Sequence, residues 1–88
     1  MHGRPGAINA ALTHLLREAR KQRGVSMDEL ARRAGVHRTY VGLLERGERQ
    51  PTVAAAAALA EALDLRFSEV LAEAERQVEA DGEPGTSS

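Results

Sequence analysis

Apolar residues recur along this chain at helical spacing, in short stretches that turn-forming residues separate. The first stretch covers about residues 10–23 and predicts an amphipathic helix with Asn9 as its N-cap. Its predicted inner face consists of Leu12, Leu15, Leu16 and Ala19. Gly24 predicts the end of this helix, because glycine readily adopts the left-handed conformation that closes helices.

Two short helices are predicted next, on either side of a tight turn at Gly35. Ser26 begins the first of them, and Glu29 three residues later completes the pattern of a capping box. The second runs from about His37 to Arg46 and ends at a glycine. The apolar residues expected to face inward from these helices are Leu30, Ala31, Ala34, Val36, Val41 and Leu44.

Two further helices complete the pattern. Thr52 predicts the N-cap of a fourth helix, whose apolar stripe is Val53, Ala56, Leu59, Ala60 and Leu63. A fifth is predicted from about Phe67 to Val78. Five helical stretches, rich in Ala and Leu, predict an all-α fold. We expect one domain over residues 9–80, a flexible arm at 1–8 and a disordered tail at 81–88.

The net charge of −1 hides a strong split between the two halves of the chain. Residues 1–50 carry ten Lys and Arg against five Asp and Glu, whereas residues 51–88 carry two against eight. This split predicts a polarised molecule with one face suited to a polyanion. The simpler interpretation is that the acidic residues only solvate the last helix.

Several function classes are disfavoured by what the sequence lacks. It contains no cysteine, and His2, His14 and His37 do not have the spacing of metal ligands. It has no Gly-rich phosphate loop and no apolar run of transmembrane length. We therefore expect a protein that is not an enzyme, needs no cofactor or metal, does not act at a membrane and is cytoplasmic.

The spacing of Ala31, Gly35 and Val36 is specific to a helix-turn-helix, which needs a small residue, a turn glycine and an apolar anchor at these intervals. With these residues the chain resembles the Cro and lambda/434-repressor class of helix-turn-helix regulators, also called the xenobiotic-response-element type. The resemblance covers roughly residues 12–71. The other matching residues are Leu16, Arg20, Gly24, Ser26, Leu30, Glu45, Gly47, Pro51, Leu59, Ala60 and Leu63. The HRTY…ERGER string also resembles small controller proteins of restriction–modification systems.

This resemblance implies a five-helix, lambda-repressor-like domain whose second and third helices form the helix-turn-helix. It implies a sequence-specific transcriptional regulator that binds double-stranded DNA with helix 37–46 in the major groove. The implied base-contacting residues are His37, Arg38, Thr39, Tyr40 and Leu43. The implied phosphate-contacting residues are Arg23, Ser26, Met27, Arg46, Arg49 and Gln50. Arg38 is the first candidate for a guanine contact, and the alternative is that it only neutralises phosphate.

Other residues have implied structural roles. Arg20 and Glu45 are expected to form a partly buried ion pair, and Asp64 occupies a turn position where the family usually has glycine. The last apolar stripe continues beyond Leu71, where family domains often end. It therefore predicts a homodimer on a palindromic operator, with Phe67, Val70, Ala74 and Val78 at the interface. The competing interpretation is that this helix folds back on its own domain.

Two alternative functions are compatible with the same sequence. One is the antitoxin of a toxin–antitoxin pair, in which the last helix or the tail also holds a toxin. The other is a protein-interaction module that uses the helix 37–46 face.

Overall fold

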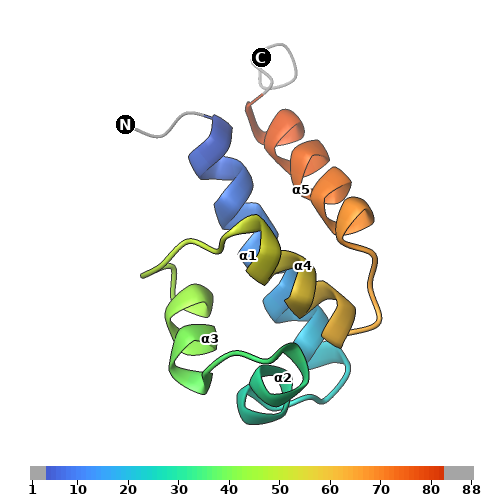
Figure 1. Cartoon of the computed structure of the whole chain (residues 1–88). Coiled ribbons are helices and arrows are strands. Elements are labelled where there is room, and N and C mark those ends of the chain that lie inside the picture. Colours follow the sequence, from blue (N-terminus) through green and yellow to red (C-terminus); the bar gives the residue numbers. More distant parts are fainter. Residues whose placement is uncertain (1–3, 83–88) are drawn as a thin grey trace.

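The computed structural model describes residues 4–82, which form five α-helices and no strand. The helices are α1 (Arg4–Gln22), α2 (Met27–Ala34), α3 (Arg38–Glu45), α4 (Val53–Ala62) and α5 (Phe67–Gly82) (Figure 1). The predicted all-α class and the order of the five helices are confirmed. None of the described helices is both long and apolar enough to cross a lipid bilayer.

A single hydrophobic core lies between the helices, and every helix contributes to it. Its largest fully buried side chains are Leu30 of α2, Val41 of α3 and Leu63 at the end of α4. α2 packs against both α3 and α4, whereas α5 lies mainly along α1 (Figure 1). This arrangement leaves α3 and α5 on opposite sides of the molecule.

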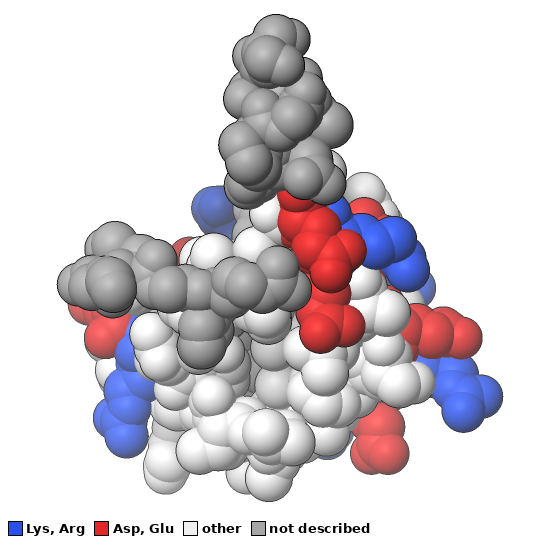
Figure 2. Space-filling view, turned by 90° about the horizontal axis from the view of Figure 1, so that it is seen from above, with Lys and Arg blue, Asp and Glu red and all other residues white. Residues whose placement is uncertain are grey.

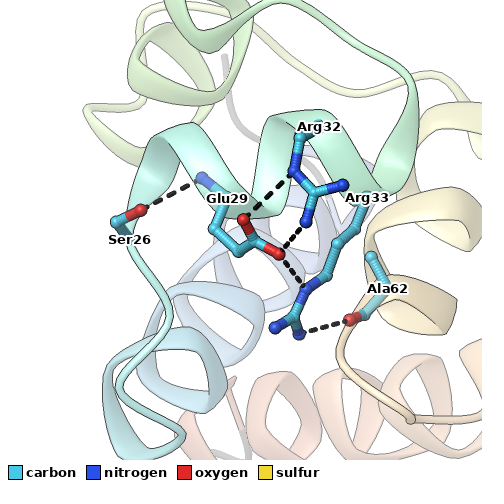
Figure 3. A network of polar contacts seen from close by, with 5 residues as sticks. All are labelled: Ser26, Glu29, Arg32, Arg33 and Ala62. Carbon is cyan, nitrogen blue, oxygen red and sulfur yellow. Dashed lines mark hydrogen bonds and ion pairs between the residues drawn. The ribbon is translucent and has the colours of Figure 1, made fainter.

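The predicted N-caps Ser26 and Thr52 are present. The Ser26 hydroxyl accepts a hydrogen bond from the Glu29 amide at 3.0 Å, and the Thr52 hydroxyl accepts one from Ala55 at the same distance. The capping box at α2 is only half formed, however. The Glu29 carboxylate turns toward Arg32 and Arg33 instead of returning to the backbone of Ser26 (Figure 3). Two nearby guanidinium groups attract the carboxylate more strongly than one backbone amide does.

The first helix begins earlier than predicted. α1 starts at Arg4, so the expected cap Asn9 lies inside the helix and residues 4–8 are not an arm. Pro5 is compatible with this, because a first-turn residue has no intrahelical acceptor for an amide hydrogen. At the other end, α5 continues to Gly82, two residues into the predicted tail. Residues 1–3 and 83–88, the rest of the predicted arm and tail, lie outside the described residues.

The prediction for α5 also needs correction. Val70 and Ala74 were expected at a dimer interface, but they are only 8% and 0% exposed within the single chain. α5 lies along α1, and Val70 lines a groove with Leu15 and Ala19 of that helix, so the apolar stripe of α5 is buried within the domain. Phe67 and Val78 are half-buried and keep some exposed surface.

The turn between α4 and α5 depends on Asp64. Its φ of 60° makes it the one non-glycine residue with positive φ among residues 4–82. Asp adopts this conformation more readily than most residues, because its short side chain can bond locally. The predicted left-handed turn is therefore present, with aspartate in the place that glycine usually takes.

Candidate nucleic-acid interface

The turn between α2 and α3 is built from backbone hydrogen bonds. Gly35 closes α2 with φ of 75°, and the Val36 amide donates to the Ala31 carbonyl at 3.0 Å. This bond spans a left-handed residue, as in the Schellman motif that ends many helices. Ala31 is only 3% exposed, and its small side chain lets α3 lie close to α2. The turn therefore sets where α3 begins and which way it points.

α3 has one buried face and one exposed face. Val41 and Leu44 are buried in the core at 1% and 2% exposure. His37, Arg38 and Thr39 are exposed at the start of the helix, and Tyr40 and Leu43 are half-buried beside them. The five predicted base-contacting residues are thus brought together. Four of them line a shallow surface hollow with Arg49: His37, Thr39, Tyr40 and Leu43.

An ion pair attaches the end of α3 to α1. Arg20 Nε lies 2.7 Å from Glu45 Oε2, and Nη2 donates to Oε1 at 2.9 Å. Arg20 Nη1 also donates to the Val25 carbonyl, in the loop that leads into α2, at 2.8 Å. The hydrogen bond from Arg20 to Glu45 raises the pKa of the guanidinium, although partial burial acts in the opposite direction. The expected structural pair is therefore present, and it joins α1, the α2 approach and α3.

Two arginines at the exposed surface have partners that sequence reasoning did not anticipate. Arg38 Nε lies 2.8 Å from Oδ1 of Asp28, which belongs to the first turn of α2. The Arg49 guanidinium lies 5.8 Å from the centre of the Tyr40 ring, within the range of a cation–π interaction. Both contacts join α3 to a neighbouring segment, so they restrict the side chains expected to meet DNA.

The predicted phosphate-contacting residues lie in three places. Arg46, Arg49 and Gln50 are exposed in the loop after α3, where Arg46 Nε lies 2.9 Å from Glu48 Oε2. Ser26 and Met27 lie at the start of α2, with Met27 packed against the core. Arg23 lines a groove between α1 and α5 whose acidic residues are Glu18, Glu69 and Glu73.

Sequence reasoning missed two further residues at this surface. Asn9 donates to Gln50 Oε1 at 3.1 Å, which places the second turn of α1 beside the loop after α3. Asp28 had no predicted role. Its contact with Arg38 depends on how the turn brings the first turns of α2 and α3 together, and no local pattern reveals it.

The arginines in the last turn of α2 are engaged within the domain. Arg32 and Arg33 both bind the Glu29 carboxylate, and Arg33 Nη1 also donates to the Ala62 carbonyl at 3.5 Å (Figure 3). The hydrogen bond from Arg32 lowers the pKa of Glu29 most, and the hydrogen bond from Arg33 lowers it further. This network stabilises the packing of α2 on the end of α4.

Comparison with known proteins places this arrangement among regulators. Residues 16–70 match the helix-turn-helix (HTH_3) family model. The control protein C.SmaI of Serratia marcescens is 36% identical over 64 residues, covering 73% of this chain and 76% of that protein. The HTH-type transcriptional regulator SutR of Escherichia coli (strain K12) is 40% identical over 57 residues, and this chain spans only 32% of its length.

Solved structures agree with these matches. The clp gene regulator ClgR from Corynebacterium glutamicum superposes with a TM-score of 0.75 and 31% identity, covering 85% of this chain and 80% of that one. An HTH_3 family transcriptional regulator from Vibrio cholerae gives 0.71 and 29%, covering 89% of this chain and 43% of that one. The family model covers more than half of the chain and includes α2, the turn and α3. The chain therefore belongs to the helix-turn-helix (HTH_3) family of transcriptional regulators.

Proposed function

We propose that this protein binds double-stranded DNA sequence-specifically, with α3 and its flanking caps, residues 37–46, in the major groove. The observation that carries the proposal is the division of α3 between a buried face and an exposed one. Val41 and Leu44 anchor the helix in the core, and Glu45 is braced by Arg20. The exposed side is thereby held rigidly, as base readout by a helix requires.

The residues at the start of α3 have separate roles in this proposal. Arg38 donates to guanine O6 and N7, which contributes about 1–3 kcal/mol of discrimination against other bases. Thr39 offers a hydroxyl to a base or a methyl group to thymine. His37, Tyr40 and Leu43 border the same hollow and contact bases further along the site.

The backbone contacts come from the segments on either side of α3. Arg46, Arg49 and Gln50 follow the helix and face one phosphate chain in this proposal. The start of α2, at Ser26 and Met27, faces the other with its backbone amides. Arg23 makes a weaker contribution, because its groove is shared with acidic residues of α5. Such phosphate contacts position the protein on the duplex and raise its affinity for DNA, but they do not select a base sequence.

The regulator acts as a homodimer on a palindromic operator, with DNA in the cytoplasm as its target. Since Val70 and Ala74 are buried, the proposed interface moves to the flank of α5. Phe67, Leu71 and Val78 are half-buried and fall within about 40° of one another around the helix. Sedimentation equilibrium tests this, because Leu71→Lys should turn a dimer into a monomer. A monomeric parent protein at high micromolar concentration would remove the dimer from the proposal.

The similarity to C.SmaI favours a controller-like regulator among the possible subfamilies, because it extends over most of both chains. Nothing in the described residues favours an antitoxin.

Selection of bound duplexes from a random DNA library tests the proposed function. The wild-type protein should enrich a two-fold symmetric motif, and Arg38→Ala should lose preference at one base pair of each half-site. Arg76→Ala is the matched control, because it removes the same charge from α5, on the side of the molecule away from α3. If the wild-type protein enriches no motif while binding a protein partner through α3, the interaction-module alternative replaces this function.

A further inference from the structure

The start of α3 breaks the usual rules for a stable helix N-terminus. Its N-cap is His37, whose side chain makes no capping hydrogen bond, and its first turn holds no acidic residue. Instead, the first helical position is Arg38, a cation at the positive end of the helix dipole. Local rules of this kind are broken most often at functional sites. Arg38 therefore does not stabilise the start of α3, and its presence there indicates a functional role.

Asp28 offsets this unfavourable start from the neighbouring helix. Its carboxylate lies 2.8 Å from Arg38 Nε, although the two side chains are 74% and 61% exposed. Asp28 itself is well placed in the first turn of α2, where the dipole favours negative charge. An ion pair this exposed adds little to the free energy of unfolding. Its geometric effect on Arg38 is the larger consequence.

We propose that Asp28 is a positioning residue that aims Arg38 at its base and so determines specificity. This inference rests on the proposed DNA-binding function of α3. Nε is the guanidinium atom nearest the carboxylate, so the outer edge with the two Nη groups stays available. That edge carries the paired donors that match guanine O6 and N7.

The pair has two opposite effects on DNA binding. It restricts the rotamers of Arg38 before binding, which lowers the entropic cost of forming the base contact. It also places a negative charge beside the phosphates, which weakens attraction to DNA of any sequence. Asp28 therefore lowers overall affinity but raises discrimination at the base pair that Arg38 contacts.

The test uses duplexes carrying the motif that the wild-type protein selects from a random library. The base pair contacted by Arg38 is the one whose preference disappears in Arg38→Ala. At that pair, Asp28→Asn should reduce discrimination about tenfold, the lower part of the range for a bidentate contact. On duplexes of random sequence, the same variant should bind more tightly than wild type.

Glu48→Gln is the matched control. Glu48 pairs with Arg46 at 2.9 Å and is similarly exposed, and its replacement makes the same change in charge. Because Arg46 is assigned to a phosphate, this variant should raise affinity for all duplexes and leave discrimination unchanged. Circular dichroism checks that each variant is folded at the assay temperature.

The outcomes separate the inference from the function on which it rests. Tighter binding of Asp28→Asn to all duplexes with undiminished discrimination would overturn the positioning role and leave a DNA-binding regulator. The same conclusion follows if Arg38→Ala changes no base preference. Failure of the wild-type protein to enrich any motif would overturn the proposed function itself, and the inference with it.

Discussion

Arg20 is the residue on which three segments of this domain converge. Its guanidinium binds Glu45 at the end of α3 and the Val25 carbonyl before α2, and both side chains of the ion pair are largely buried, at 13% and 11% exposure. Removing one member of such a pair leaves the other charge desolvated and without a partner. The orientation of α3 therefore depends on a side chain in α1.

Glu45→Ala should lower the free energy of unfolding by about 3 kcal/mol, because it leaves Arg20 buried without its carboxylate. Arg17 is a matched control, since its Nε lies 3.7 Å from the same carboxylate but its side chain is 43% exposed. Arg17→Ala should cost about 0.5 kcal/mol or less. Urea unfolding measures both, and equal effects would show that the pair does not brace α3.

The left-handed conformation of Asp64 predicts how substitutions at this position change the free energy of unfolding. Asp64 has a φ of 60°, which glycine adopts without the strain that a Cβ causes. The greater entropy of glycine in the unfolded chain offsets part of this gain in stability. Asp64→Gly should therefore raise the free energy of unfolding by about 0.5 kcal/mol, whereas Asp64→Val should lower it by more than 1 kcal/mol. Thermal unfolding of both variants tests the turn, and a stabilising valine would contradict it.

At the scale of the element, α5 shows how neighbouring structure decides what an apolar stripe does. Its stripe looked like an interface because family domains often end near Leu71. The structure instead packs it on α1, and Ala74 has no exposed surface. Alanine at this position lets the two helices approach closely. The proposed dimer interface is therefore placed on the flank of α5.

Ala74→Glu should lower the free energy of unfolding by about 3 kcal/mol or more, because a carboxylate would be buried between α5 and α1. Ala80→Glu is the control, since it makes the same change at an exposed position of the same helix. That variant should stay within about 0.5 kcal/mol of wild type. Similar stabilities for the two variants in urea would mean that α5 does not dock as described.

The ion pairs of α2 predict that part of the stability of the protein is lost in acid. Glu29 has a folded-state pKa below the ordinary value of 4.5, so the stabilisation it contributes is present above pH 4.5 and is lost as pH falls through the folded value. The difference in Tm between wild type and Glu29→Gln should thus be largest near neutral pH and shrink below 4.5. Because the site is exposed, 1 M NaCl should shrink it too. A difference that persists in acid would contradict the ion-pair network.

At the scale of the whole molecule, the charge split of the sequence is only partly a division in space, because Arg23 shares a groove with Glu69 and Glu73 of α5. The basic loop after α3 and the acidic α5 lie on different sides of the domain (Figure 1). In the end-on view of Figure 2, acidic and basic side chains lie around a broad surface without charges. The exposed start of α4 is also apolar, with Val53 74% exposed. In the proposed function, such a molecule approaches a polyanion with α3 leading.

Salt dependence measures that polarity. The slope of log K against log salt concentration should fall by about 0.9 per protomer in Arg49→Ala, because one phosphate contact is lost. Arg76→Ala removes a charge from α5, where Arg76 pairs with Glu73, and should leave the slope unchanged. A filter-binding titration between 50 and 200 mM salt provides both slopes. Equal changes in the two variants would place α5 as near to DNA as the loop after α3.

The sequence by itself determined the helices, their caps at Ser26 and Thr52, the turn at Gly35 and the pairing of Arg20 with Glu45. The first three are properties of a few adjacent residues, which local spacing encodes, and the pair followed from family resemblance. Only the tertiary structure decided that α1 begins at Arg4, that α5 is buried along it and that Asp28 meets Arg38. These features depend on which surfaces meet after folding, and that depends on the orientation of whole helices.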